Sequence, residues 1–474
     1  MILLFALSCA KPAPPAVAAV APAPVVAPPV AREMGGWPAP AREDLPPNFI
    51  VIVIDDMGVD KQAAYGTHPE PSPTPNLDAL AARSLVFDHA WVMPGCTPTR
   101  AAALTGRMPS RTGAGVPEPM PPPAWELPLE EVTIPEMLAS APDTWSTAAV
   151  GKWHLNDYGS PSGIRHPLLQ GFGSWSGTLG NPGPVPDGLG RGQHGYYHHA
   201  YVDVYGALRE SDEYATTETT QDALAAMSGL QPPFFAWIAY NAVHTPLEPP
   251  PLALYDGPAG AERGPVRYDA VAGALDTELG RLLAEIPPAV LARSVLVVIG
   301  DNGTPAHAIR PPAVAAHGKM TLYEGGIRVP LYVSGPGVTP GHTTRLTHVV
   351  DLLPTIAEIA GVDLTGQALD GTSWLPTHAD PAAPGPATVY TEILGPNGPP
   401  PWAHHRRTAR DAAFKLVSDG ETERLHDVRG GSDDGPDLLA AGELAPDAAV
   451  SLERLRAEIA RHVVPYGQAG GDNP

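Results

Sequence analysis

Four stretches of the chain join a short apolar run to polar residues that directly follow it. The apolar runs cover residues 48–54, 144–150, 234–240 and 294–299, and the polar residues after them include Asp55, Asp56, Lys152, His154, His244, Asp301 and Asn302. Continuous apolar runs of this length predict strands that are buried on both faces, as in a parallel sheet. Because the carboxyl ends of parallel strands meet at one edge, where ligands bind, the sequence predicts one site built from all four stretches.

Helical patterns between these runs predict an α/β fold. The further expected elements are helices at 76–83, with Asn76 as N-cap, at 268–283, at 351–360 and at about 452–463, and strands at 327–333, 414–417 and 425–428. Alternation of strands and helices is typical of the α/β class. A length of 474 residues suits one large domain with a smaller appendage, or two or three ordinary domains. The pattern changes at 378–385, which predicts a small C-terminal subdomain after that loop.

The polar groups after the first and fourth runs have the composition of a metal site. Asp55, Asp56, Asp301 and Asn302 offer oxygen ligands, without a companion cluster of cysteine and histidine. Such ligands favour a hard cation, calcium or magnesium, over zinc. An acidic pair after a strand often only caps a helix, but a second oxygen-rich group after another buried strand favours the metal interpretation.

Cys96 is one of two cysteines in the chain, so it cannot belong to an ordinary disulfide framework. A lone cysteine is most often a buried small hydrophobic residue. Here, however, Gly95 and Pro98 indicate a helix start, and Arg100 follows one turn later. A thiol near a cation and a helix N-terminus is in an electropositive, reactive setting.

The run Cys96-Thr97-Pro98-Thr99-Arg100, followed by Thr105-Gly106-Arg107, resembles the C-x-P-x-R…T-G-R signature of the type I sulfatases of the alkaline phosphatase superfamily. Blocks similar to that family continue from about Asn48 to the last helix, and Thr99 stands where many members have serine. The resemblance implies a large, mixed but mostly parallel sheet flanked by helices (48–380), and a C-terminal α+β subdomain with an antiparallel sheet (381–474). It also implies that a formylglycine-generating enzyme oxidises Cys96 to formylglycine.

The same resemblance implies the roles of the site residues. Asp55, Asp56, Asp301 and Asn302 would hold one calcium ion beside residue 96, which would itself be a ligand. Arg100 and Lys152 would brace the formylglycine hydrate, while His244 and Lys319 would hold the sulfate. One hydroxyl of the hydrate would attack sulfur, His244 would protonate the leaving alkoxide, and His154 would take the proton of the second hydroxyl. Taken singly, each lysine is as well explained as a surface residue and each histidine as a structural one.

The implied activity is that of a sulfuric ester hydrolase, arylsulfatase-like, acting on an aryl or carbohydrate sulfate monoester. Two alternatives stay open: a phosphonate monoester or phosphodiester hydrolase of the same superfamily, and a non-catalytic protein that binds sulfated glycans if Cys96 is unmodified. The chain carries 51 acidic and 29 basic residues, a net charge of -22, which disfavours nucleic acid as a partner. An anionic substrate is still allowed, because cations inside a pocket reverse the local potential.

The N-terminal residues resemble the end of a bacterial lipoprotein signal. Residues 1–9 are an apolar leader ending in Cys9, a candidate for lipidation, and residues 10–47 form a Pro/Ala-rich linker. We therefore expect an exported protein, periplasmic or at the cell envelope, tethered by a lipid on Cys9.

We expect the loops 159–199 and 385–407 to determine substrate specificity. The tract of His194, His198 and His199 resembles a metal-binding tract, but such a loop is more often solvated or substrate-facing, and no matching ligand set stands nearby in the sequence. The sequence does not decide whether Arg165-His166 and residues 404–407 line the mouth of the pocket.

Overall fold

The computed structural model describes residues 36–37, 44–117, 125–183, 194–260, 264–430 and 434–462. Within these residues the main sheet has ten strands. In spatial order they are β10 (Gly341–His348), β2 (Leu85–Trp91), β9 (Leu331–Ser334), β8 (Ser294–Gly300), β1 (Asn48–Ile54), β7 (Phe234–Ala239), β3 (Ser146–Lys152), β4 (Ser174–Thr178), β5 (His199–Val202) and β6 (Leu208–Ser211). Cys9 and most of the predicted linker lie outside the described residues.

The four apolar runs of the sequence are the four adjacent central strands β8, β1, β7 and β3. β1 pairs in parallel with β7 and β8, and β7 pairs in parallel with β3. In this register Val53 pairs with Ala239 and Ile54 pairs with Gly300, so these neighbouring strands end side by side at one edge of the sheet. The predicted common edge is therefore confirmed, and so is the mixed, mostly parallel α/β sheet.

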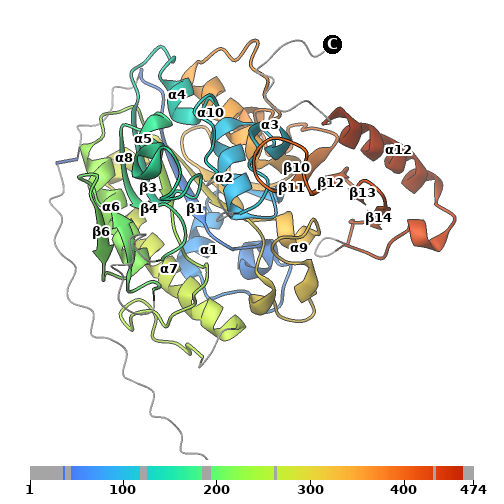
Figure 1. Cartoon of the computed structure of the whole chain (residues 1–474), viewed down its shortest axis with the longest axis horizontal. Helices are drawn as coiled ribbons and strands as arrows, with labels where there is room; N and C mark the ends of the chain where they lie inside the picture. The colour runs from blue at the N-terminus through green and yellow to red at the C-terminus, as the bar shows by residue number, and fades with distance from the viewer. Residues whose placement is uncertain are drawn as a thin grey trace, which may run out of the picture.

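Helices cover both faces of this sheet (Figure 1). The helices of the described residues are α1 (Pro75–Ala81), α2 (Cys96–Thr105), α3 (Pro109–Thr112), α4 (Ile134–Leu138), α5 (His166–Leu169), α6 (Ala215–Gly229), α7 (Pro265–Glu285), α8 (Pro288–Leu291), α9 (Glu324–Ile327), α10 (Leu352–Ala360), α11 (Leu375–Ala379) and α12 (Pro446–Arg461), of which α12 belongs to the C-terminal part. Alternate residues of β1 enter two separate cores. Val51 and Val53 pack with α2, α4 and α10, whereas Ile52 and Ile54 pack with α1, α6 and α7. Burial on both faces explains why β1 has no polar residue between Phe49 and Ile54.

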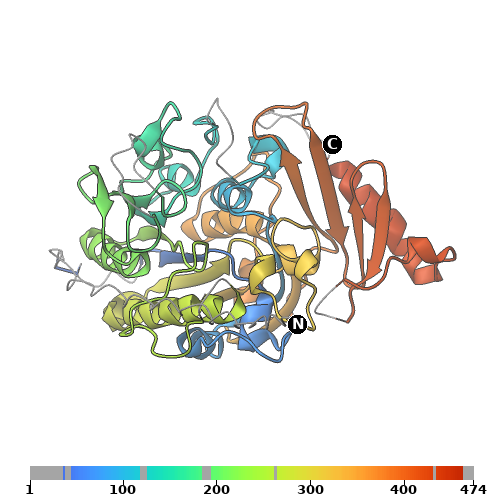
Figure 2. The same cartoon turned by 60° about the horizontal axis from the view of Figure 1, so that its bottom comes forward.

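A second, antiparallel sheet stands beside the main body, as expected for the C-terminal part (Figure 2). Its strands run in the order β11 (Val389–Gly395), β12 (His404–Arg410), β13 (Phe414–Ser418) and β14 (Glu423–Asp427). α12 packs on β12 and β13 and buries Leu452 and Leu455. A small apolar cluster that includes Trp91, Leu322 and Ile393 joins this sheet to the main body.

Two local predictions are wrong for reasons of tertiary structure. Asn76 does not cap α1, because the helix begins one residue earlier, at Pro75. The carboxylate of Asp276, in α7, instead accepts hydrogen bonds from the backbone amides of Asn76 and Leu77, at 3.0 and 2.8 Å. The strand expected at 327–333 is shorter than predicted: Ile327 is the last residue of α9, and β9 begins only at Leu331. Among the described helices, none combines the length and the apolar composition needed to cross a membrane.

Candidate active site

Three carboxylates and one amide meet at the carboxyl edge of β1 and β8. Asp55, Asp56, Asp301 and Asn302 are all buried. The amide nitrogen of Asp56 donates to Asp301 Oδ1 at 3.1 Å, and Asn302 Nδ2 donates to Asp56 Oδ1 at 2.7 Å. Tyr268, from α7, donates its hydroxyl to the backbone oxygen of Asp56 at 2.7 Å. The two strand ends are therefore held together as one oxygen-rich centre.

Three cations neutralise these carboxylates. Lys152, the last residue of β3, donates to Asp55 Oδ2 and to Asn181 Oδ1, the latter at 2.6 Å. Arg100 donates to Asp301 Oδ2 through Nε and Nη2 at 3.0 and 2.8 Å. Lys319 Nζ lies 2.5 Å from Asp56 Oδ1. Because the pairs are one to one, the centre is close to neutral in the absence of a further ion.

Two opposing effects act on the pKa values of these carboxyl groups: burial raises them, and the nearby cations lower them. Burial would raise the pKa of Asp55, but Lys152, His244 and Arg100 outweigh it and lower that pKa below its usual value. Burial and the neighbouring charge of Asp55 raise the pKa of Asp301, which Arg100 only partly offsets. The surrounding cations therefore stabilise the ionised form of Asp55 more strongly than that of Asp301.

Cys96 is the first residue of α2, with Gly95 as N-cap, and its side chain is 1% exposed. Its sulfur and carboxylate oxygens of Asp55 and Asp301 lie within 4.8 Å of one another. Burial raises the pKa of the Cys96 thiol, which Lys152 and Lys319 offset only in part. The expectation of an activated thiol is therefore wrong: the helix start is as predicted, but desolvation and the nearby carboxylates favour the protonated form.

Two histidines border the same centre. His244 Nδ1 lies 2.7 Å from the backbone oxygen of Thr245, and Nε2 lies 3.9 Å from Asp56 Oδ2. Since a ring nitrogen facing a carbonyl must donate, this geometry puts the proton on Nδ1 and turns Nε2 toward the site. Burial lowers the pKa of His244 and of His154, and Lys152 and Arg100 lower that of His154 further. Both rings are thus neutral near pH 7.

Backbone strain is concentrated at this centre. Among the described residues, the non-glycine residues with φ in the left-handed region are Asp56 at 61°, His154 at 60° and Met320 at 70°. Each belongs to the site or is the neighbour of a site residue, Lys319. Such conformations persist where the surrounding structure fixes them, and they cluster at functional sites.

The oxygen-rich centre fits a hard divalent cation. Asp55 Oδ1 and Asn302 Oδ1 are buried and accept no hydrogen bond. Buried oxygens without a donor are rare in proteins, and a cation satisfies them. The groups of described residues with metal-ligating geometry are Asp55, Asp56 and His244, and Asp55, Cys96 and Asp301. Both groups share Asp55, so Asp56, His244, Cys96 and Asp301 lie around this carboxylate.

Other histidines singled out in the sequence lie elsewhere. His199 is buried against Glu218 at 3.1 Å, and His198 contacts Asp212 at 2.6 Å. His166 is buried and accepts from the indole of Trp153 at 2.9 Å. These three rings have structural partners instead of a share in the metal centre, whereas His404 lines a groove that adjoins Lys319.

Sequence reasoning missed the residues that hold the site loops. Asn181 binds Lys152, and the hydroxyl of Tyr196 donates to the backbone oxygens of Asn241 and His244 at 3.0 and 2.9 Å. Asn181 falls in the loop expected to govern specificity, but nothing in its local sequence distinguishes it. Tyr196 sits beside the histidine tract, and only the fold shows that it supports His244.

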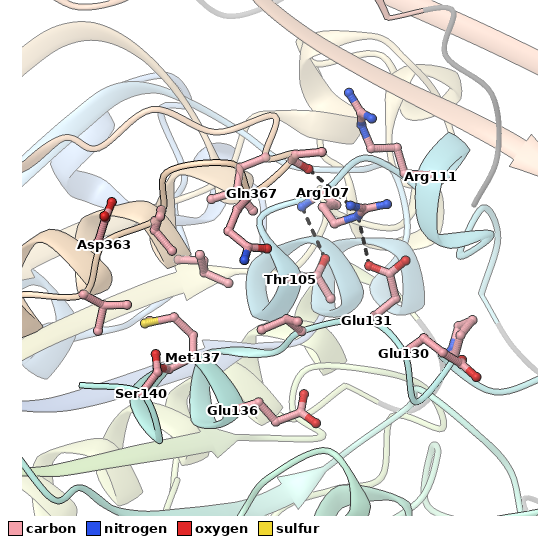
Figure 3. A pocket seen from close by; sticks show the side chains of 17 residues that line it. Thr105, Arg107, Arg111, Glu130, Glu131, Glu136, Met137, Ser140, Asp363 and Gln367 are labelled. Atoms are coloured by element: carbon pink, nitrogen blue, oxygen red, sulfur yellow. Dashed lines mark hydrogen bonds and ion pairs between the residues drawn. The ribbon is translucent and has the colours of Figure 1, made fainter. Parts of the chain in front are cut away.

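A cavity of about 520 Å³ lies at the opposite end of α2 from Cys96, and it is lined by none of the predicted catalytic or metal residues (Figure 3). Arg107, from the Thr-Gly-Arg part of the signature, points into it and pairs with Glu131 at 3.0 Å. Its amide nitrogen donates to the hydroxyl of Thr105 at 3.3 Å. In the folded protein Arg107 therefore supports the end of the helix whose first residue is Cys96, and does not reach the site.

A parallel sheet edge that combines buried oxygen ligands suited to a hard cation with three basic side chains is typical of metal-assisted enzymes that act on anionic esters. The chain belongs to the sulfatase family: the model of that family matches residues 47–362. It is 34% identical to human arylsulfatase A over 355 residues, and 30% identical to the N-acetylgalactosamine-6-sulfatase of Sus scrofa over 372 residues. These alignments cover 69% and 70% of this chain, but only 66% of each relative.

Solved structures agree on the fold. Ps i-CgsB in complex with a neocarrahexaose superimposes with a TM-score of 0.69 at 24% identity, covering 86% of this chain and 92% of that protein. The PsFucS1 sulfatase from Pseudoalteromonas sp. gives a TM-score of 0.65 at 21% identity, with coverages of 88% and 90%. The resemblance to type I sulfatases and the fold class inferred from it are thereby confirmed.

Proposed function

We propose that this protein hydrolyses a sulfate monoester at the centre around Asp55, after Cys96 has been converted to formylglycine. The observation that carries the proposal is the position of Cys96, at the start of α2 and close to Asp55 and Asp301, with Lys152 and Lys319 bound to the flanking carboxylates. The names of the relatives refer to aryl sulfates and to N-acetylgalactosamine 6-sulfate, so we propose an aryl or carbohydrate sulfate as substrate.

The charges of the site support an anionic substrate bound together with a cation. Asp55, Asp56 and Asp301 balance Arg100, Lys152 and Lys319, so a divalent ion would make the centre positive by about two charges. We propose calcium, held by the three carboxylates, by Asn302 and by residue 96. Such an ion would offset the charge that develops on the sulfuryl oxygens.

The two histidines provide the proton transfers in this proposal. After conversion and hydration, residue 96 would carry two hydroxyls: one would attack sulfur as the bond from sulfur to the ester oxygen breaks, and loss of the proton of the other would release sulfate and restore the aldehyde. His244 turns Nε2 toward the centre, and an anionic ester next to that ring favours its protonated form, so His244 donates to the leaving oxygen. His154 is neutral and buried at the same edge, which suits it to accept the proton of the second hydroxyl.

The first experiment is the mass of tryptic peptide 84–100, from protein coexpressed with a formylglycine-generating enzyme. We expect a mass below that of the thiol form and an aldehyde that reacts with a hydrazide. The matured protein should turn over 4-nitrophenyl sulfate faster than an aryl phosphate diester, and C96A should abolish turnover. An intact thiol in the peptide, or full activity of C96A, would refute the proposal. Faster turnover of the diester would favour the phosphodiester hydrolase instead.

Export to the cell envelope and a lipid on Cys9 stay predictions, because Cys9 lies outside the described residues. They are tested separately, by metabolic labelling with a fatty-acid analogue of the wild type and of C9A in a bacterial host. We expect label and membrane association in the wild type alone.

A further inference from the structure

An apolar groove adjoins the sulfatase centre. It has a volume of about 640 Å³, and its apolar walls are Val116, Pro117, Met320, Pro396 and Ala403. Lys319, Gly395 and His404 complete the lining. Met320 is 38% exposed, and Pro396, Ala403 and His404 are exposed as well, so the groove opens to solvent. Its walls come from four separate segments, which only the fold brings together.

Two wall residues of this groove, Pro117 and Met320, pack against Gly95, the residue before Cys96. A Cβ atom at Gly95, the residue before Cys96, would lie 2.7 Å from Pro117 Cγ and 3.3 Å from Met320 Sδ. The amide nitrogen of Met320 donates to the backbone oxygen of Pro94 at 2.8 Å. Lys319 lines the groove and also binds Asp56. A molecule with one end at Lys319 would therefore extend along Met320 and Pro117.

The side chains that line the groove determine which organic groups of a sulfate ester can bind there. Of the described residues that line the groove, Lys319 alone carries a fixed charge, and the five wall side chains offer neither a strong donor nor a strong acceptor. Burial, Arg406 and His405 lower the pKa of His404, so its ring is neutral near pH 7. A sugar would lose hydrogen bonds to water against such walls without replacing them, and no second cation stands among the described lining residues to bind a further sulfate.

Resting on the proposed function, we propose that this groove binds the apolar part of the substrate, so that the protein prefers aryl and alkyl sulfates over sugar sulfates, and that Met320 is the residue that sets this preference. The flexible thioether of Met320 adapts to ligands of different shape. Its place directly after Lys319 ties the apolar wall to the sulfate end of the ester, so the organic group is positioned as the sulfate is bound.

The test compares kcat/KM for 4-nitrophenyl sulfate with that for N-acetylgalactosamine 6-sulfate, in the matured wild type and three variants. M320N removes the apolar wall but keeps a residue type that tolerates a positive φ. M320L keeps the apolar wall. V450N changes an exposed apolar residue of α12, outside the groove, as a matched control. We expect the wild type to favour the aryl ester, and M320N to reduce the ratio of the two constants about tenfold, while M320L and V450N keep it.

A series of n-alkyl sulfates tests the groove in the wild type alone, independently of any folding defect of M320N. We expect kcat/KM to rise about two- to fourfold per methylene from ethyl to hexyl sulfate. A flat series, a wild-type ratio at or below one, or an unchanged ratio in folded M320N would overturn the proposal while the protein still hydrolyses sulfate esters. A matured protein that hydrolyses none of these esters would refute the proposed function, and this inference with it.

Discussion

Glu324 joins the segment that carries Lys319 to the C-terminal sheet, and its replacement by glutamine should weaken the fold measurably. The residue begins α9, five positions after Lys319, and is 3% exposed. Its carboxylate accepts from Arg410 of β12 at 3.2 Å and from Lys415 of β13 at 3.3 Å. Its amide nitrogen donates to Asp434 Oδ2 at 2.6 Å. The ionised side chain thus links two β-strands to the loop behind the site.

The expected cost of E324Q at pH 7 is about 3 kcal/mol of unfolding free energy. Two buried charge-assisted hydrogen bonds contribute about 1.5–3 kcal/mol each, and removing one partner of a buried ion pair costs about 3–5 kcal/mol. Glutamine keeps one acceptor oxygen, which places E324Q at the lower end. Lys415 still pairs with Asp434 at 2.9 Å, so one of the two cations is not left alone.

The pH dependence follows from the pKa of Glu324. Burial would raise this pKa, but Lys415 and Arg410 outweigh burial and lower it in the folded state. A carboxyl group with a lowered folded pKa stabilises the fold above its unfolded pKa of about 4.3, and that stability is lost as the pH falls through the folded pKa. The difference between wild type and E324Q should therefore be full at pH 7 and shrink below about pH 4.

Urea unfolding followed by tryptophan fluorescence at pH 7, 5 and 3.5 measures this difference. E453Q is the control, because Glu453 is 74% exposed and its pair with Arg456 at 2.8 Å is an exposed helix pair, worth less than about 1 kcal/mol. If E324Q and E453Q were equally stable at pH 7, or if the E324Q deficit did not depend on pH, the buried ion pair would not be the cause and the reasoning would be wrong.

Two further predictions concern the metal centre and the capping of α1. Calcium should raise the melting temperature of the wild type, and EGTA should lower it. N302A should need a higher calcium concentration for the same shift, because it loses Asn302 Oδ1, which with Asp55 Oδ1 is a buried oxygen of this centre that accepts no hydrogen bond. An N302A midpoint equal to that of the wild type would contradict the assignment of Asn302 as ligand. D276A should lose about 2 kcal/mol of unfolding free energy, because the first backbone amides of α1 lose their acceptor. N76A should lose less. If urea unfolding showed N76A to be the less stable variant, Asn76 would be the cap after all.

The central sheet was predictable because its signal is local. β1 and β8 contain no polar side chain after their first residues, Asn48 and Ser294, and each ends directly before a carboxylate, so the pattern alone places Asp55 and Asp301 at one edge. The start of α2 was likewise predictable from Gly95 and Pro98. Lys319 had no such signal. It entered through the resemblance to sulfatases, and the structure brings it to the same edge as Asp55, in contact with Asp56.

The boundaries and partners of other elements were not predictable, because they depend on residues far away in the sequence. Asp276 caps α1 from 200 positions away, and no local pattern around Asn76 indicates it. Lys319 contacts Asp56 across 263 positions. The pKa of Cys96 depends on desolvation by everything packed around it, which is why a setting that was electropositive in sequence turned out to favour the protonated thiol.

The sequence by itself determined which residues form the buried strands, which polar residues follow them, and where the helix with Cys96 begins, because these properties depend on periodicity over a few neighbours. Only the tertiary structure decided which charges pair, which oxygens stay without a donor, and how Val116, Met320, Pro396 and Ala403 form one groove. The physical reason is that electrostatic energy and solvent exclusion depend on distances between segments, and the order of strands in the sheet sets those distances.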